Sequence, residues 1–244
     1  MSDILRPDWP VPANIHAFTT TRLGPGVSEL PFYRFNLGAR CGDAPAAVRA
    51  NREALRREYG LPGEPLWLHQ VHGIEVVSDD GMRGSDPLAD AAVTTQSASV
   101  LAVLTADCLP VLFCNTSGTE VAAAHAGWRG LAAGMLEATV TAMRSAPHEL
   151  MAWLGPAAGP QRYEVGEDVR QAFLAADAAA ASAFTPTRPG HFLIDMPAIA
   201  RQRLAACGVT QVYGGEHCTL TDIRFYSHRR EQRTGRMASL IWMT

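Results

Sequence analysis

Residues 101–130, LAVLTADCLPVLFCNTSGTEVAAAHAGWRG, alternate between apolar runs and short polar breaks. The sequence TADC follows the first run, and the turn sequence NTSG separates the run at 111–114 from the run at 121–124. Short apolar runs bounded by turn residues are typical of buried β-strands. The stretch therefore predicts neighbouring strands, followed by a helix that begins after Gly130.

Polar side chains with transferable protons or metal affinity stand at the breaks of this stretch. Asp107 and Cys108 lie in the first break, and His125 and Arg129 follow the last run. A buried sheet gains nothing from such residues as packing, whereas a site at the ends of strands uses all of them. We therefore expect a functional site where these strands end.

On either side of this stretch, helical patterns alternate with short apolar runs. Residues 46–59 read as a helix, with Asp43 as its N-cap and Pro45 in its first turn. Residues 131–144 predict a second, alanine-rich helix. Because hairpins are mixed with the alternating elements, we expect one α/β domain over residues 1–244. It is expected to be a sandwich with a mixed central sheet flanked by helices.

Composition excludes several classes of protein. A net charge of -3 and a pI near 6.2 give no electrostatic case for binding nucleic acid. No apolar run approaches the ~20 residues of a membrane helix, and the N-terminus lacks the pattern of a signal peptide. Five cysteines, an odd number without framework spacing, argue against a secreted disulfide protein. We expect a cytoplasmic protein with reduced thiols.

Three residues of metal-binding type, His72, Cys108 and His125, occur at the ends of predicted elements, 36 and 17 residues apart. Structural zinc fingers use close pairs, but three ligands with an open fourth position are the pattern of a catalytic zinc, which activates water. Two alternatives remain open. Cys108 is a thiol nucleophile activated by His125, or the histidines are ordinary turn residues and Cys108 packs as a small apolar side chain.

Arg129 also has two interpretations. It follows Gly127 at the start of a predicted helix, where an arginine and a helix N-terminus together favour anions. Alternatively, it is a surface arginine that pairs with Glu137. By contrast, we expect His228 to be a surface or turn residue.

Seven motifs then identify a family. They are FNLGARCGDAPAAVRANREAL (35–55), HQVHG (69–73), ADAAVTT (89–95), TADCLPVLF (105–113), AAAHAGWRG (122–130), LGPAAGPQRYEVGEDV (154–169) and FYSHRREQRTGRMASLIW (225–242). Together they resemble the multicopper polyphenol oxidase (laccase-domain) family. It is also called purine nucleoside phosphorylase-like and, in bacteria, peptidoglycan editing factor. The resemblance covers nearly the whole chain.

The resemblance implies an α/β sandwich related to cysteine-hydrolase-like folds. It also implies a metal site, usually assigned to zinc, at His72, Cys108 and His125. The activities implied are phosphorolysis of adenosine, inosine, guanosine and methylthioadenosine, and deamination of adenosine to inosine. Copper binds such donors at least as tightly as zinc. The sequence lacks the His-x-His pairs of several copper sites, so we do not expect multicopper oxidation.

Within this interpretation, Cys108, Asp107 and His125 are the candidate catalytic residues, with Asp107 carrying protons. Phosphorolysis requires an arginine to hold phosphate, because its guanidinium offers a fixed fork of donors. Arg129 is the first candidate and Arg52 the second, and Asn36 is a candidate ribose contact.

Two alternatives to a nucleoside enzyme remain. One is an amidase that edits a peptidoglycan precursor by removing misincorporated L-Ser from UDP-MurNAc-L-Ser. The other is a metal-binding partner protein without catalysis. For the enzyme, we expect small-molecule ligands (a purine nucleoside and phosphate), no nucleic acid, no membrane, and a monomer or weak homodimer.

Overall fold

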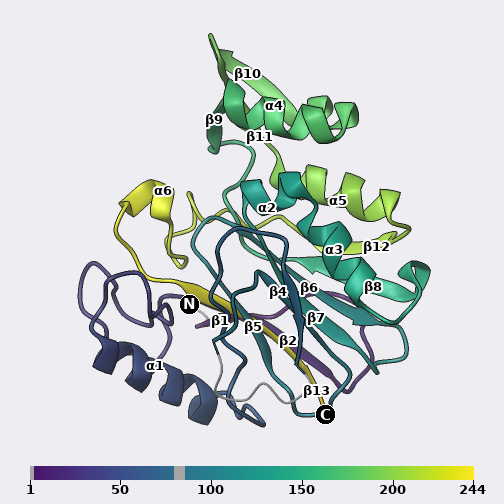
Figure 1. Cartoon of the computed structure of the whole chain (residues 1–244). Coiled ribbons are helices and arrows are strands. Elements are labelled where there is room, and N and C mark those ends of the chain that lie inside the picture. The colour runs from purple at the N-terminus through teal and green to yellow at the C-terminus, as the bar shows by residue number, and fades with distance from the viewer. Residues whose placement is uncertain (1–2, 80–85) are drawn as a thin grey trace.

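Two β-sheets packed face to face form the centre of the protein (Figure 1). The computed structural model describes residues 3–79 and 86–244. The larger sheet is mixed, with β3 parallel to β4 and β8 parallel to β12. In its order across the sheet it contains β12 (Gln211–Gly214), β8 (Leu150–Leu154), β6 (Leu109–Asn115), β7 (Val121–Ala126), β4 (Ala91–Thr94) and β3 (Val76–Ser78). The smaller sheet is antiparallel and contains β1 (Ile4–Leu5), β2 (Ile15–Thr20), β13 (Met237–Met243) and β5 (Leu101–Thr105).

The predicted strands of the central stretch are confirmed as β5, β6 and β7. Every residue of β6 is buried, and its side chains enter two different clusters of the core. Leu112 and Cys114 face the smaller sheet, whereas Val111 and Phe113 face the helices on the other side. A strand that is covered on both faces reads as a continuous apolar run, which is why the sequence pattern was informative here.

Helices cover the outer faces of both sheets. Phe18 and Leu240 of the smaller sheet pack against Leu55 of α1. Leu136 and Ile199, from two other helices, pack in the core on the outer face of the larger sheet. The predicted α/β sandwich with a mixed sheet and flanking helices is therefore confirmed. The covering helices are α1 (Pro45–Glu58), α2 (Trp128–Ala133), α3 (Met135–Ala142) and α5 (Met196–Ala206), and the 3-10 turn η1 (Pro147–Glu149) precedes β8.

A small lobe projects beyond one end of the sheets, at the top of Figure 1. Phe173 of its helix is buried in the same core cluster as Leu131 of α2 and Ile199 of α5. Its antiparallel sheet has the order β10-β11-β9. The lobe comprises β9 (Glu164–Gly166), α4 (Glu167–Ala176), the 3-10 segment η2 (Ala178–Ala183), β10 (Phe184–Arg188) and β11 (His191–Ile194). None of the helices in the described residues combines the length and apolar composition that a membrane span requires.

Two local predictions were wrong. The helix predicted over 131–144 is interrupted at Gly134, whose φ of 104° is left-handed and ends α2 before α3 begins. The side chain of Asp43 does not cap the N-terminal N–H groups of α1, because Ala44 is the N-cap residue. Instead, the Asp43 carboxylate accepts hydrogen bonds from the side chains of Ser28 and Asn36.

Candidate active site

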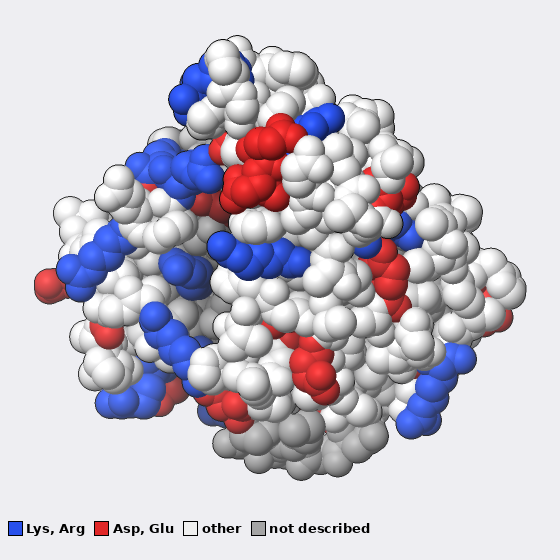
Figure 2. All heavy atoms as spheres, turned by 45° about the horizontal axis from the view of Figure 1, so that its top comes forward, with Lys and Arg blue, Asp and Glu red and all other residues white. Residues whose placement is uncertain are grey.

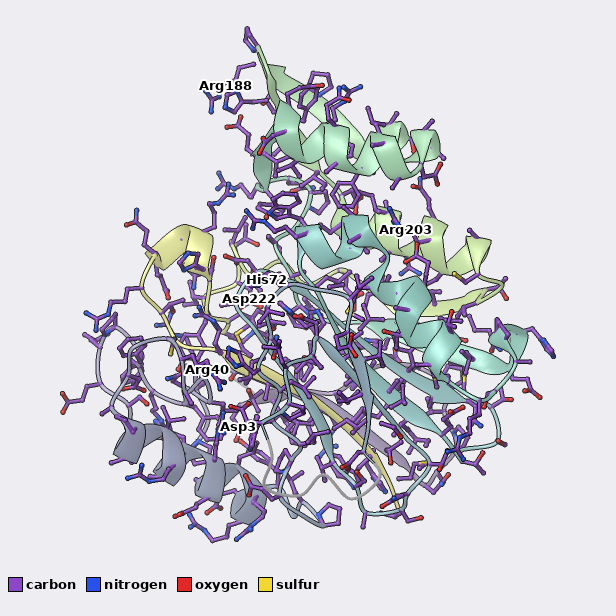
Figure 3. All side chains as sticks on the ribbon, in the orientation of Figure 1. Asp3, Arg40, His72, Arg188, Arg203 and Asp222 are labelled. Carbon is purple, nitrogen blue, oxygen red and sulfur yellow. The ribbon has the colours of Figure 1, made fainter. Side chains whose placement is uncertain are left out.

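The structure brings His72, Cys108 and His125 together at one end of the two sheets. His72 lies in the loop before β3, with a left-handed φ of 64°. Cys108 lies in the turn between β5 and β6, and His125 is near the end of β7. Figure 3 labels His72 near the ends of the strands, below α2. The expected clustering at strand ends is therefore present.

The three donor groups fit one metal ion. The Cys108 Sγ and His72 Nε2 atoms are 3.7 Å apart. This distance agrees with the separation of about 3.6 Å between the sulfur and nitrogen ligands of a tetrahedral zinc. One donor atom from each of the three residues lies within 4.8 Å of the others. At Gly127, a Cβ atom would lie only 3.0 Å from Cys108 Sγ and 2.8 Å from His72 Cδ2. A side chain at position 127 would therefore crowd these two donors, and glycine leaves the space between them free.

The site favours the thiolate form of Cys108. Burial raises the pKa of the thiol, but the imidazoles of His125 and His72 lower it by more, so that the net change is downward. Burial lowers the pKa of His125, whereas Cys108 and Asp90 raise it to a value above normal. The thiolate is the form that binds metals and attacks electrophiles. The geometry is therefore compatible with Cys108 as a metal ligand and with Cys108 as a nucleophile.

Asp90 is a site residue that the sequence analysis missed. It is fully buried, directly before β4. Its carboxylate accepts a hydrogen bond of 2.8 Å from Nδ1 of His125 and others from the backbone N–H groups of Val71, His72 and Gly73. The available signal was an acidic residue inside the apolar sequence ADAAV, because a buried carboxylate requires partners.

A cavity of about 480 Å³ opens beside the three donors. Of the described residues that line it, none is acidic. Figure 2 shows basic side chains gathered around a hollow of the surface, left of its centre. The guanidinium groups offer planar forks of donors that suit phosphate and carboxylate. The arginines that line this arginine cavity are Arg40, Arg52, Arg129 and Arg236.

Arg129 has the most available guanidinium. It stacks on the ring of Trp128 at 4.4 Å, and no hydrogen bond or ion pair to it occurs within the described part of the chain. The alternative that it pairs with Glu137 was wrong, because Glu137 binds Arg203 at 2.6 Å. Since α2 has only six residues, the case for an anion at this point rests on the guanidinium.

Arg52 is more constrained. Its Nε and Nη2 atoms both donate to the carbonyl oxygen of Leu37, at 3.0 and 2.9 Å. Its guanidinium lies 3.9 Å from the ring centroid of Trp67. These contacts leave its Nη1 atom as the donor available to a ligand.

Asn36 and Asp107 lie outside the set of residues that line the arginine cavity. Asn36 is fully buried, and its amide binds Gly38, Cys41, Asp43 and the backbone N–H of Arg236. These contacts support the loop at 38–43 and the segment before β13 that carries Arg236. A contact of Asn36 with ribose stays a prediction.

The carboxylate of Asp107 is occupied on both oxygens. One accepts from the Thr219 hydroxyl and the other from the backbone N–H of Arg229, both at 2.6 Å. It is therefore placed to hold the start of α6 (His228–Glu231). Proton transfer by Asp107 stays a prediction.

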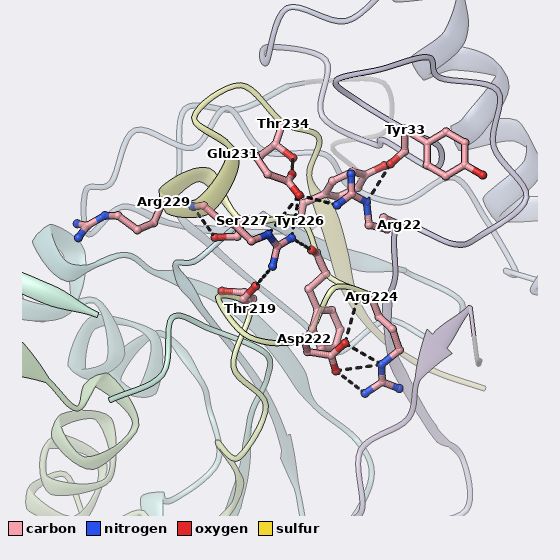
Figure 4. Close-up of polar contacts among 12 residues, drawn as sticks. Arg22, Tyr33, Thr219, Asp222, Arg224, Tyr226, Ser227, Arg229, Glu231 and Thr234 are labelled. Carbon is pink, nitrogen blue, oxygen red and sulfur yellow. Dashed lines mark hydrogen bonds and ion pairs between the residues drawn. The ribbon is translucent and has the colours of Figure 1, made fainter. Parts of the chain in front are cut away.

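A network of ion pairs also holds α6 (Figure 4). Glu231 accepts from Arg22 at 2.6 Å and from Arg230 at 2.9 Å, and Arg230 also donates to the Thr219 carbonyl. We call Arg22, Thr219, Arg230 and Glu231 the α6 anchor. Helix α6 brings His228 to the wall of the arginine cavity. His228 is exposed, as expected, but it faces the site.

Comparison with known proteins agrees with this arrangement. Residues 16–244 match the family model described as multi-copper polyphenol oxidoreductase laccase. Purine nucleoside phosphorylase PA4543 of Pseudomonas aeruginosa is 54% identical over 245 residues, covering 100% of this chain and 99% of that protein. Purine nucleoside phosphorylase YfiH of Escherichia coli is 51% identical, with both chains fully covered. The crystal structure of Neisseria meningitidis protein NMB0706 superimposes with a TM-score of 0.95 at 49% identity, covering 99% of each chain.

Proposed function

The chain belongs to the multi-copper polyphenol oxidoreductase laccase family, and from this premise we propose that it is a metal-dependent purine nucleoside phosphorylase. The observation that carries the proposal is the arginine cavity, where Arg40 pairs with Asp86 but three further arginines form no ion pair to a described carboxylate. These three lie beside the thiol of Cys108 and two imidazoles. The names of the relatives support the same reaction. The described residues hold a single His/Cys cluster of this kind, which argues against multicopper oxidation.

His72, Cys108 and His125 are the residues that would hold the metal. Two nitrogen donors and one sulfur donor with an open position favour zinc, and copper is the alternative. When bound there, the metal supplies a Lewis acid that polarises an oxygen atom or activates water.

In phosphorolysis, a phosphate oxygen bonds to C1′ of the ribose while the bond from C1′ to the purine nitrogen breaks. The products are ribose 1-phosphate and the purine, which takes up a proton. Arg129 is the first candidate to hold phosphate, because its fork is unoccupied and it lies in the cavity wall. Arg52 is the second, through Nη1. Such contacts orient the phosphate for attack on C1′ and reduce the entropic cost of that step.

Deamination of adenosine is a second activity that we propose for the same site. The three-residue cluster supports it, because a metal held by His72, Cys108 and His125 would keep an open position and would supply the chemistry that activates water. Water then adds at C6 of adenine and ammonia leaves, so that inosine forms.

An editing amidase is the alternative, and the surplus of positive charge in the arginine cavity favours it. Arg52, Arg129 and Arg236 line the cavity without forming an ion pair to a described carboxylate. One phosphate ion does not balance these charges. A UDP-linked precursor such as UDP-MurNAc-L-Ser carries a diphosphate and a serine carboxylate, about three negative charges in all, which would balance these three guanidiniums.

Product analysis of metal-quantified protein separates these activities. Adenosine is incubated with and without phosphate, and UDP-MurNAc-L-Ser is incubated in parallel, for wild type and Cys108→Ala. We expect phosphate-dependent release of adenine and ribose 1-phosphate, lost in the variant. Inosine formation would establish deamination. Release of L-serine with no reaction of adenosine would replace the phosphorylase by the amidase.

A further inference from the structure

The carboxylate of Asp90 contacts both histidine donors through different parts of the chain. Its Oδ1 atom accepts from Nδ1 of the His125 ring at 2.8 Å and from the backbone N–H of His72 at 2.9 Å. Its Oδ2 atom accepts from the N–H groups of Val71, at 3.1 Å, and Gly73, at 2.7 Å. A carboxylate offers about four acceptor positions, so every position of Asp90 serves the metal site or its loop.

We propose that Asp90 is the positioning residue that aligns both histidine donors for the metal. Because the carboxylate only accepts, the hydrogen on the neutral His125 ring must be on Nδ1, which leaves the Nε2 lone pair for the ion. The three successive N–H groups form a nest around the same carboxylate. This nest stabilises the left-handed backbone of His72, which is unfavourable for a residue with a Cβ atom.

A second buried carboxylate shows what a purely structural role looks like in this fold. Glu120 lies directly before β7, at the end of that strand opposite His125, and is 3% exposed. It accepts from the backbone N–H groups of Arg144 and Ser145, at 2.7 and 2.9 Å, and from the Ser145 hydroxyl. Glu120 thus holds a backbone turn as Asp90 does, but it contacts no donor of the metal site. Glu120→Gln is therefore the matched control for Asp90→Asn.

The Asp90→Asn variant keeps the shape of the side chain and changes its hydrogen-bonding pattern. An asparagine NH2 group facing His125 donates to Nδ1, which moves the ring hydrogen to Nε2 and blocks the donor atom. Asp90→Ala instead removes the acceptor and leaves the nest open to a small anion. Formate, which carries the same carboxylate group, is then expected to occupy the nest and restore the site.

The test measures metal binding and the histidine tautomer, neither of which requires turnover. Zn²⁺ affinity is measured by competition with a chromophoric chelator. The tautomer is measured by long-range ¹H–¹⁵N spectra of the metal-free protein at a pH above the raised pKa of His125, where its ring is neutral. We expect the Nδ1–H tautomer in wild type and Nε2–H in Asp90→Asn. We also expect Zn²⁺ affinity to fall about 10–100-fold in Asp90→Asn, and to recover partly with formate in Asp90→Ala. Glu120→Gln is expected to bind Zn²⁺ within about 2-fold of wild type.

Zn²⁺ affinity in folded Asp90→Asn equal to that of Glu120→Gln, with an unchanged His125 tautomer, would overturn the proposal. Asp90→Asn is the decisive variant if Asp90→Ala fails to fold. The inference rests on the metal site of the proposed function, but not on the reaction. Absence of phosphorolysis in the wild type would refute the proposed function and leave these binding and tautomer measurements intact.

Discussion

Arginine side chains crowd two neighbouring parts of this molecule, the α6 anchor and the arginine cavity, and the two differ in what the guanidiniums bind. In the anchor, Arg22 and Arg230 both reach the carboxylate of Glu231, and Arg230 also binds backbone carbonyls (Figure 4). In the cavity, Arg129 stacks on Trp128 and forms no hydrogen bond or ion pair within the described residues, and Arg52 donates to a single carbonyl oxygen. The first arrangement balances charge within the fold, whereas the second leaves positive charge for an incoming anion.

The comparison separates stability from activity. Paired groups in the anchor are expected to contribute mainly to the free energy of unfolding, because their partners are part of the fold. Unpaired cations in the cavity contribute little to that free energy and act when an anion binds. Variants in the α6 anchor should therefore lower stability more than activity, and variants in the arginine cavity should lower activity more than stability.

Cys108→Ser should have the largest effect on activity. Removing the thiolate takes away one of the three metal donors, and loss of metal assistance worth about 4 kcal/mol corresponds to roughly a 1000-fold fall in kcat/KM. The unfolding free energy of the metal-free protein should change by less than about 1 kcal/mol. Phosphorolysis assays and urea unfolding after chelation measure the two quantities. Full metal content with wild-type kcat/KM would remove Cys108 from the site.

Arg129→Ala should raise the KM for phosphate and lower kcat/KM by about 10–100-fold, because hydrogen bonds between charged groups are worth about 1.5–3 kcal/mol. Arg129→Lys should recover only part of this loss, since lysine lacks the planar fork. Arg170 provides a matched control, because it stacks on Phe192 in the lobe, away from the cavity. Equal phosphate dependence of the Arg129→Ala and Arg170→Ala variants would reject Arg129 as the phosphate ligand.

Glu231→Gln should show the opposite profile. It leaves Arg22 and Arg230 without their shared carboxylate, so unfolding free energy should fall by about 2 kcal/mol. The kcat/KM should stay within about 3-fold of wild type if α6 retains its position. Chemical unfolding measures the change in unfolding free energy, and an adenosine phosphorolysis assay measures the change in kcat/KM. A large loss of activity with unchanged stability would mean that the anchor belongs to the catalytic site.

The contribution of Glu231 should also depend on pH. Burial raises the pKa of this carboxyl group, but hydrogen bonds from Thr234, Arg230 and Arg22 lower it by more, so its folded pKa lies below normal. The stabilisation is therefore present above the unfolded value of about 4.3 and lost as the pH falls through the folded pKa. Urea unfolding should show a constant difference between wild type and Glu231→Gln from pH 7 to about 5, and a shrinking one below. An undiminished difference well below pH 4 would contradict this assignment.

Asp107→Asn should have the smallest effect. Asp107 adjoins Cys108 and also binds Thr219 of the α6 anchor, so the variant tests whether it acts in stability or in catalysis. An amide still accepts from the N–H of Arg229 and donates to the hydroxyl of Thr219, so the hold on α6 largely remains. We expect kcat within about 10-fold of wild type and a loss of stability under about 1 kcal/mol. A fall of about 100-fold or more in kcat at unchanged stability would establish Asp107 as a proton carrier.

The sequence predicted those parts of the fold that local pattern determines. The strands β5 to β7 were readable because both faces are covered, and the metal donors because polar residues interrupt apolar runs. The break at Gly134 was missed, since glycine in an alanine-rich helix has no local signature of a left-handed φ. The short strands β9 and β10 carry too few buried residues to show a period.

The arginine cavity depended on tertiary structure. Arg52 comes from α1, Arg129 from α2 and Arg236 from the segment before β13, so only the packing of distant elements brings them to one wall. The role of Asp90 depended on tertiary structure as well, because its partners lie 17 to 35 residues away. The internal contacts of Asn36 depended on tertiary structure too, because this buried residue accepts from the backbone N–H of Arg236, 200 residues away.

A metal titration of phosphorolysis would show whether the cluster of His72, Cys108 and His125 is the catalytic metal site. Metal-free protein is titrated with Zn²⁺, and phosphate-dependent formation of adenine and ribose 1-phosphate from adenosine is measured at each step. We expect the rate to rise linearly and level off at one Zn²⁺ per chain, and Cys108→Ser to stay inactive throughout. A rate that does not depend on bound metal, or no ribose 1-phosphate from fully loaded protein, would contradict this expectation.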